Sequence, residues 1–234
     1  MTILPGYRPQ APGTHPPLDF PGYASTAARA PRRKPIQLDH TLSEITGPRL
    51  PNAVAAADGL DLTHHAGGEA VGQRIIVAGR VLDEDGRPVP NTVVEVWQAN
   101  AAGRYTHAGD QHDAPLDPYF DGAGRVFTDA DGAYRFLTIK PGAYCWRNHP
   151  NAWRPQHIHF SLFGPGFATR LITQMYFAGD PLIPLDPMVA SIPDPAARGR
   201  LIAEFDLGLT EPEFALGYRW DIVLRGRAQT PMEI

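Results

Sequence analysis

The sequence has little cysteine, no long apolar run and little net charge. Cys145 is the single cysteine among 234 residues, which excludes an intrachain disulfide and is typical of a reducing compartment such as the cytoplasm. No apolar run approaches the roughly 20 residues that span a membrane. The first residues show no basic start followed by an apolar stretch, so we expect no export signal. A formal net charge of −4 does not favour a surface that binds polyanions.

Proline and glycine are abundant instead. The chain has 25 prolines and 23 glycines. Because proline breaks helices and glycine weakens them, this composition argues against a coiled coil or a bundle of long helices. Hydrophobic residues make up 43% of the chain, which is enough for a packed core. The composition therefore favours a globular protein made of short elements.

Residues 1–72 differ from the rest of the chain, because prolines interrupt every short apolar segment there. We expect this part to be an extended arm that lies on a globular body or on a partner chain. Short helices are plausible at 41–46 and 52–57. His64 and His65 adjoin two glycines and are interpreted as surface loop residues.

From residue 73 onward the pattern is that of short strands. Turn residues at 83–90 and 129–132 predict two hairpins, and 129–132 lacks the further acidic ligands of a calcium loop. We expect an all-β domain over residues 73–234, a β-sandwich of two mainly antiparallel sheets with long loops and one or two short helices. The strands are expected at Arg74–Leu82, Thr92–Ala99, Val126–Thr128, Ala133–Thr138, Ile158–Phe163, Arg170–Phe177 and Tyr218–Leu224, and an amphipathic helix at Pro195–Phe205.

Two histidines stand two positions apart at the start of a predicted strand. His157 and His159 share one face of that strand, with Cα atoms roughly 6.6 Å apart at about 3.3 Å per residue. Two imidazoles at this spacing can bind one metal ion, although paired histidines on a strand are also ordinary structural residues. The irregular loop 141–150 just before them is rich in tyrosine, tryptophan and arginine, which favours a site.

Tyr105 and Tyr144 lie in the same region of the sequence. Tyrosine is an unusual ligand for zinc, whose sites favour cysteine, histidine and carboxylate. A phenolate is a hard anionic donor that suits a hard trivalent ion such as Fe(III), and a bound cation lowers the phenol pKa from its usual value of about 10. Two tyrosines and two histidines would therefore suit an oxidised iron that coordinates an electron-rich diol.

Several short strings resemble the intradiol ring-cleaving dioxygenases, and most narrowly the β-subunit branch of that family that acts on protocatechuate (3,4-dihydroxybenzoate). The resemblance covers nearly the whole chain, including the proline-rich arm. No single string is specific, but the combined tyrosine and histidine pattern is. The strings are Gly103–His107, Ala114–Pro118, Tyr144–Asn148, Trp153–Phe160, Leu171–Phe177 and Asp180–Pro184.

The resemblance implies a non-haem Fe(III) held by Tyr105, Tyr144, His157 and His159. Tyr105 and His157 would be equatorial ligands, and Tyr144 and His159 axial ones. The implied reaction inserts O2 between the two hydroxyl-bearing carbons of protocatechuate and gives 3-carboxy-cis,cis-muconate. Such a dioxygenase would serve the β-ketoadipate pathway of aromatic catabolism.

The resemblance also implies roles for residues around the metal. Arg154 would stabilise negative charge that develops on the substrate, with a salt bridge near the loop as its structural alternative. Gln174 would hydrogen-bond Arg154 or line the pocket, and Tyr144 would leave the metal as the diol binds. Trp146 and Arg147, with Tyr105, would shape the substrate pocket.

A homologous α subunit is the implied partner, in a hetero-oligomer of αβ units whose pocket lies at their interface. We expect residues 1–72 mainly to contact that partner and residues 73–234 to form the catalytic domain. Two positions depart from the family pattern: Cys145 stands where proline is expected, and His149 where glycine is frequent. Neither is a proposed ligand.

Other functions remain open at the level of sequence. The diol could be catechol or hydroxyquinol, although relatives of that type usually carry a helical N-terminal domain that is not evident here. A non-catalytic β-sandwich binding module would also fit the strand pattern. A hydrolytic zinc enzyme is weakly supported, because no carboxylate is placed near His157 in the sequence.

Overall fold

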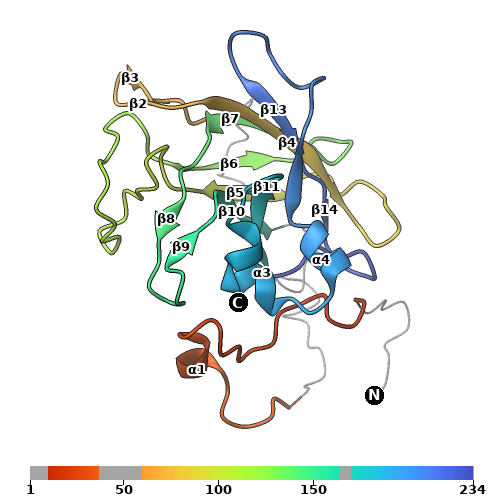
Figure 1. Ribbon diagram of the computed structural model, residues 1–234. Helices are drawn as coiled ribbons and strands as arrows, with labels where there is room; N and C mark the ends of the chain where they lie inside the picture. Colours follow the sequence, from red (N-terminus) through yellow and green to blue (C-terminus); the bar gives the residue numbers. More distant parts are fainter. Residues whose placement is uncertain (1–9, 37–59, 164–169, 234) are drawn as a thin grey trace.

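The computed structural model describes residues 10–36, 60–163 and 170–233, and strands dominate these parts (Figure 1). The strands are β1 (Leu60–Asp61), β2 (His64–His65), β3 (Gly68–Glu69), β4 (Arg74–Leu82), β5 (Val93–Trp97), β6 (Ala123–Phe127), β7 (Ala133–Ile139), β8 (Tyr144–Cys145), β9 (Trp153–Arg154), β10 (His157–Phe163), β11 (Leu171–Phe177), β12 (Ile202–Phe205), β13 (Leu216–Arg219) and β14 (Ile222–Val223). The helices are α1 (Thr26–Arg29), the 3-10 helix η1 (Ile183–Leu185), α3 (Pro187–Ser191) and α4 (Pro195–Gly199).

Ten strands form one mixed sheet in the order β1-β7-β4-β13-β12-β11-β10-β5-β6, with β14 beside β4. Strands β6 and β7, near opposite ends of this order, lie in contact, so the sheet curves round and nearly closes. The expected all-β class is confirmed. The division into two antiparallel sheets is not, because β12 pairs in parallel with β11 and antiparallel with β13 and so joins the two parts.

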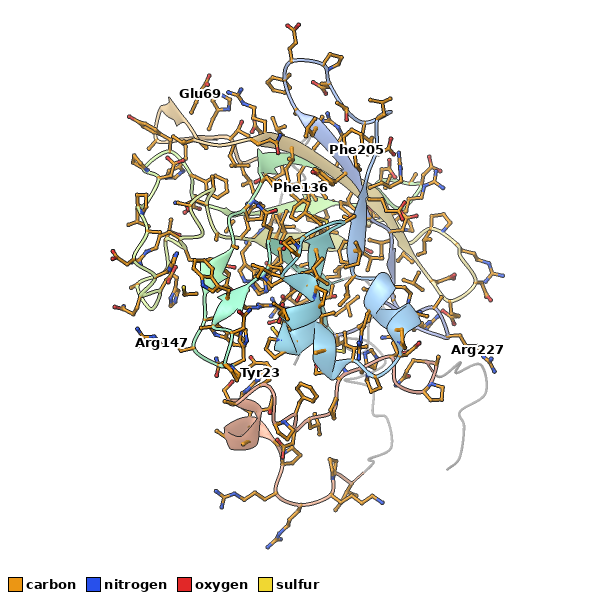
Figure 2. All side chains as sticks on the ribbon, viewed as in Figure 1. Tyr23, Glu69, Phe136, Arg147, Phe205 and Arg227 are labelled. Carbon is orange, nitrogen blue, oxygen red and sulfur yellow. The ribbon has the colours of Figure 1, made fainter. Side chains whose placement is uncertain are left out.

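The core fills the inside of this curved sheet. Most apolar side chains of β4 and β10 are buried, as the β-branched and aromatic sequence of both strands predicts, and only Leu82 and Phe163 at the strand ends are partly exposed. Phe136 of β7 packs against Phe160 of β10 with ring centroids 6.0 Å apart, near the centre of the molecule in Figure 2. Tyr134 belongs to the core, and its Oη donates a hydrogen bond to the Trp220 carbonyl at 2.6 Å. Each buried aromatic of this kind contributes about 1.5–3 kcal/mol.

Both predicted turns exist, but neither forms a hairpin. The backbone N–H of Gly132 donates to the Asp129 carbonyl, as in a tight turn, and the loop after β4 folds back on Leu82. However, β4 pairs with β7 and β5 pairs with β6. Each turn therefore carries the chain from one part of the curved sheet to the other, and the predicted pairing of sequence neighbours was wrong.

The helix expected at Pro195–Phe205 was also wrong over its second half. Asp194 caps α4 by accepting a hydrogen bond from the N–H of Ala196, and the helix ends at Gly199. Ile202–Phe205 then forms β12, because this segment gains ladder hydrogen bonds to β11 and β13 that a longer helix would forgo. Pairing with distant strands outweighed the local helical pattern.

The strand expected at Tyr218–Leu224 is divided into β13 and β14. The break lies at Trp220, whose N–H donates to the Ala78 carbonyl. A Cβ at Gly79 would stand 1.7 Å from the Trp220 carbonyl oxygen, so only glycine permits this approach of the two backbones.

Residues 10–36 lie beneath α3 and α4 in Figure 1. They are tied to the body by three backbone groups: Asp194 N–H donates to Gly13 O at 3.1 Å, Met232 N–H to His15 Nδ1 at 3.1 Å, and Ala24 N–H to Asn148 O at 2.9 Å. Strand β1, which precedes residue 73, pairs in parallel with β7.

Other expectations for the N-terminal part fall partly outside the structure. His64 and His65 are exposed, as expected, although they form the short strand β2 rather than a loop. The helices expected at 41–46 and 52–57 lie outside the described residues. Within the described residues, no helix is long and apolar enough to cross a lipid bilayer.

Candidate metal centre

Strand β10 presents both histidines on one face. His157 and His159 have ring centroids 4.9 Å apart and are almost completely buried. The neighbouring strands bring Trp97 of β5 and Gln174 of β11 opposite His159, and Tyr176 of β11 opposite His157. The Trp97 ring stacks on the His159 ring with centroids 4.8 Å apart, which fixes the plane of that imidazole.

The short hairpin of β8 and β9 adds Tyr144 and Arg154. The two residues are direct partners across this hairpin, so their side chains emerge side by side. Tyr144 Oη lies 3.3 Å from His157 Nε2. Arg154 Nη1 lies 3.2 Å from the same nitrogen. The two strands of this hairpin thus bring one phenol and one guanidinium to the histidines.

Tyr105 comes from the long loop before β6. This loop lies close to the start of β8 at Gly103, which has φ +79°. A Cβ at this position would stand 2.2 Å from the Ala143 carbonyl oxygen, so only glycine permits the contact. The Tyr105 ring lies 5.4 Å from that of Tyr144 and 6.4 Å from that of His159, measured between centroids. Its Oη is buried and has no hydrogen-bond partner. A buried polar atom of this kind calls for a partner such as a cation.

The histidine nitrogens are arranged as metal ligands usually are. His157 Nδ1 lies 2.7 Å from the Pro155 carbonyl, and His159 Nδ1 lies 3.1 Å from Glu233 Oε2. Both partners can only accept, so each Nδ1 carries the hydrogen and each Nε2 keeps its lone pair. A backbone carbonyl or a carboxylate on the far nitrogen is the common support of a metal-binding imidazole.

Burial determines the protonation of Tyr105, Tyr144 and His157 when no cation is bound. It raises the pKa of Tyr105 well above that of a free tyrosine, and it also raises the pKa of Tyr144. Burial, followed by the charge of Arg154, lowers the pKa of His157 well below its usual value. Tyr105, Tyr144 and His157 are thus neutral without a cation, and a cation bound beside the phenols would favour the phenolates.

The residues present fit a metal ion only if the tyrosines take part. Within residues 10–36, 60–163 and 170–233, no group of three or more His, Cys, Asp or Glu side chains is placed to hold one. Two buried phenols and two imidazoles that each keep an Nε2 lone pair remain as the donor set, and the Nε2 of His157 faces Tyr144 Oη and Arg154 Nη1. Hard phenolate oxygens suit a trivalent ion better than zinc.

Arg154 is the most heavily bonded side chain beside these donors. Its Nη2 donates to Gln174 Oε1 at 2.7 Å, to Tyr176 Oη at 2.9 Å and to Asp186 Oδ2 at 2.7 Å. Burial would lower the pKa of Arg154, but Tyr176 and Asp186 outweigh it and raise the pKa well above the usual value. The guanidinium is therefore a fixed positive charge, and it makes both the expected contact with Gln174 and a buried salt bridge.

The remaining predicted pocket residues lie in the loop of the β8–β9 hairpin. The Trp146 ring faces the Arg154 guanidinium at 5.2 Å and meets the Tyr23 ring edge-on at 4.7 Å. Arg147 is exposed at the outer edge of the molecule (Figure 2), and Cys145 is exposed as well. The structure thus brings Trp146, but not Arg147, into contact with Arg154.

Sequence reasoning missed four residues of this site: Trp97, Tyr176, Asp186 and Glu233. Tyr176 could have been found, because it alternates with Gln174 on one strand face. Trp97 ends a predicted strand, but its partner strand could not be known. Asp186 and Glu233 come from distant segments, and no local signal connects them with Arg154 or His159.

Comparisons with known proteins identify relatives over nearly the whole chain. A family described as "Dioxygenase" matches residues 45–226, and one described as "Protocatechuate 3,4-dioxygenase beta subunit N terminal" matches residues 7–41. Protocatechuate 3,4-dioxygenase beta chain from Burkholderia cepacia is 60% identical over 227 residues, which cover 94% of both chains.

More distant relatives include the protocatechuate 3,4-dioxygenase alpha chain of Pseudomonas putida, 32% identical over 69% of this chain and 76% of that one. A solved structure of hydroxyquinol 1,2-dioxygenase from Pseudomonas putida DLL-E4 matches with a TM-score of 0.55 and 25% identity, over 86% of this chain and 71% of that chain. The chain therefore belongs to the intradiol dioxygenase family, and within it the chain is similar to protocatechuate 3,4-dioxygenase beta chains.

Proposed function

We propose that this chain is the iron-bearing β chain of a protocatechuate 3,4-dioxygenase, which cleaves the ring of protocatechuate with O2 to give 3-carboxy-cis,cis-muconate. The observation that carries the proposal is the convergence of Tyr105, Tyr144, His157 and His159, whose neighbouring rings lie 4.9–6.4 Å apart. The 60% identity to a β chain over nearly the full length supports the substrate.

A non-haem Fe(III) would be held by Tyr105 Oη, Tyr144 Oη, His157 Nε2 and His159 Nε2. When bound, the iron would supply a Lewis-acidic centre that chelates the two diol oxygens and prepares the ring for attack by O2. The imidazoles are already fixed in the required tautomer by Pro155 and Glu233.

Tyr144 is placed to move a proton. Burial raises the pKa of Tyr144, so a phenolate at this position is a strong base as soon as it is free of a cation. Its Oη can therefore accept one of the two hydroxyl protons of an arriving diol.

Arg154 would stabilise the negative charge of the bound diol. Its guanidinium is buried and immobilised by Gln174, Tyr176 and Asp186, and its Nη1 faces His157. A preorganised cation in a water-poor site requires no reorientation when charge develops on the substrate. Trp146 covers the guanidinium and would form one wall of the pocket, with Tyr105 opposite and Arg147 at the rim.

The partner in this proposal is a homologous α chain, since a relative of that type matches a large part of this chain. Residues 1–72 would mainly contact it, with residues 73–234 as the catalytic domain. The exposed side chains of Arg32, Arg33 and Lys34, which follow α1, would face the partner. A cytoplasmic location would fit the single cysteine.

The test is an anaerobic titration of the co-purified αβ protein with protocatechuate, followed in the visible spectrum. Tyrosinate-to-Fe(III) charge transfer should colour the protein red-brown, protocatechuate should shift the band, and admitting O2 should yield the muconate. A colourless, iron-free protein would contradict the proposal and favour a binding module.

Catechol and hydroxyquinol are the competing substrates. Catechol 1,2-dioxygenase of Candida albicans is 35% identical over 168 residues. The match of residues 7–41 to a β-subunit segment favours protocatechuate instead. A higher kcat/KM for catechol or hydroxyquinol than for protocatechuate would reverse this choice.

A further inference from the structure

The segment 229–233 is held against strands β11 and β14 next to the site. Glu233 N–H donates to the Ile172 carbonyl at 2.8 Å, and Thr230 N–H donates to the Val223 carbonyl at 2.9 Å. Met232 N–H donates to His15 Nδ1 at 3.1 Å, so the N-terminal arm fastens the same segment from the other side. The backbone on both sides of Met232 is thus fixed, and the Glu233 side chain has a defined direction.

The Glu233 side chain points to His159. Glu233 Oε2 lies 3.1 Å from His159 Nδ1, and the two side chains are only 22% and 11% exposed. The Glu233 side chain also lines a cavity of about 20 Å³ together with Gln174 and Thr173. The carboxylate is therefore mostly shielded from solvent behind the imidazole, where a charge acts more strongly than at the surface.

We propose that Glu233 is a positioning residue of the metal centre, which orients His159 and strengthens Nε2 as a donor by sharing the Nδ1 hydrogen. This inference rests on the proposed function, because it concerns the iron held by His159. A carboxylate on the far nitrogen gives the imidazole more anionic character, which favours Fe(III) over Fe(II). His15, Met232 and Glu233 thereby connect the N-terminal arm with a ligand.

The experiment compares the iron-loaded αβ protein with its Glu233→Gln variant, which keeps the size and an acceptor oxygen but removes the charge. Glu204→Gln on β12 is the matched control, because Glu204 is exposed. We expect the variant to release iron to a chelator about 10- to 100-fold faster. Its charge-transfer band should move to longer wavelength and its Fe(III)/Fe(II) potential should become more positive, because a weaker donor leaves the iron more electron-poor.

Two further variants complete the series. Glu233→Asp keeps the charge and should restore most of the wild-type band, whereas Glu233→Ala removes charge and acceptor and should release iron faster than Glu233→Gln. A Glu233→Gln protein with the wild-type band, potential and iron release overturns the inference, as does a Glu204→Gln control that shifts equally. If the wild-type protein itself holds no iron, the proposed function fails instead, so the two failures are distinguishable.

Discussion

Arg154 and Asp186 form a salt bridge in which the side chains are only 2% and 0% exposed. Asp186 Oδ1 also accepts the N–H of Met188 and so caps α3. One carboxylate therefore serves two roles, neutralising the buried guanidinium and starting the helix that covers it. Removing it would leave an uncompensated charge in the interior, which is far more destabilising than losing an exposed ion pair.

We predict that Asp186→Ala lowers the free energy of unfolding by about 3–5 kcal/mol, because it breaks a buried ion pair from one side. Urea denaturation of the iron-free protein measures this. The control is Asp85→Ala, which removes the carboxylate that pairs with the exposed Arg87, and it should change stability by less than about 1 kcal/mol. Equal denaturation midpoints for the two variants would contradict the prediction.

At Tyr105, one substitution should raise the stability of the protein and weaken its binding of iron. Its buried Oη lacks a hydrogen-bond partner, so Tyr105→Phe should stabilise the iron-free protein by about 1 kcal/mol while weakening iron binding and the visible band. Thermal unfolding and iron content measure the two effects.

Tyr134→Phe is the matched control for that change, because its Oη donates to the Trp220 carbonyl. It should destabilise the protein by about 1–3 kcal/mol and leave the iron content unchanged. Loss of stability in Tyr105→Phe would show that this hydroxyl is satisfied in solution.

At the scale of elements, the local sequence predicted the residue ranges of the strands well but the pairing of the strands badly. β4 occurs at the predicted residues, and β7, β10 and β11 deviate by a single residue. These strands are set by β-branched and aromatic runs between turn residues, which act locally. Which strands pair depends on the curvature of the whole sheet, so the two hairpins and the second half of the helix at Pro195–Phe205 could not be read from local pattern.

The candidate site likewise contains residues that the sequence indicated and residues that it did not. Tyr105, Tyr144, His157 and His159 were expected to lie together because their combined pattern resembles that of the intradiol dioxygenases, and the structure brings their rings together. Glu233 and Asp186 could not, because each reaches the site from a segment distant in sequence and is an ordinary acidic residue there. Supporting contacts of this kind require the folded chain.

The loop that delivers Tyr105 depends on one glycine. Gly103→Ala should lower the free energy of unfolding by more than about 2 kcal/mol, since it adds left-handed strain and a clash with the Ala143 carbonyl, and it should displace Tyr105 from the metal. Chemical denaturation and the intensity of the visible band are the measurements.

Gly67→Ala provides the control, because Gly67 has a similar φ of +81° but nothing within 4 Å of its added Cβ. It should show only the strain of about 1–2 kcal/mol and keep the full band. If both variants behave alike, the close approach at Gly103 does not hold the loop.

At the scale of the whole molecule, the proposed ligands come from a loop, the β8–β9 hairpin and β10, so a bound ion would connect separate parts of the chain. Removing iron with a chelator under reducing conditions should lower the melting temperature by about 5–10 °C, as expected for an ion held at roughly 100 times its Kd in a chain of this size. Restoring Fe(III) should restore both the temperature and the colour. An unchanged melting temperature after complete iron removal would place the ion elsewhere or exclude strong binding.

The two-stranded ladder between Tyr144 and Arg154 has a mechanical consequence. Because the two backbones are paired directly, a swing of the phenol that moves its backbone must carry the guanidinium with it. Arg154 is in turn anchored through Asp186 to α3. In the proposed mechanism, the stiffness of this small ribbon would limit how fast one diol replaces another, and a softer loop between residues 146 and 152 would speed that exchange.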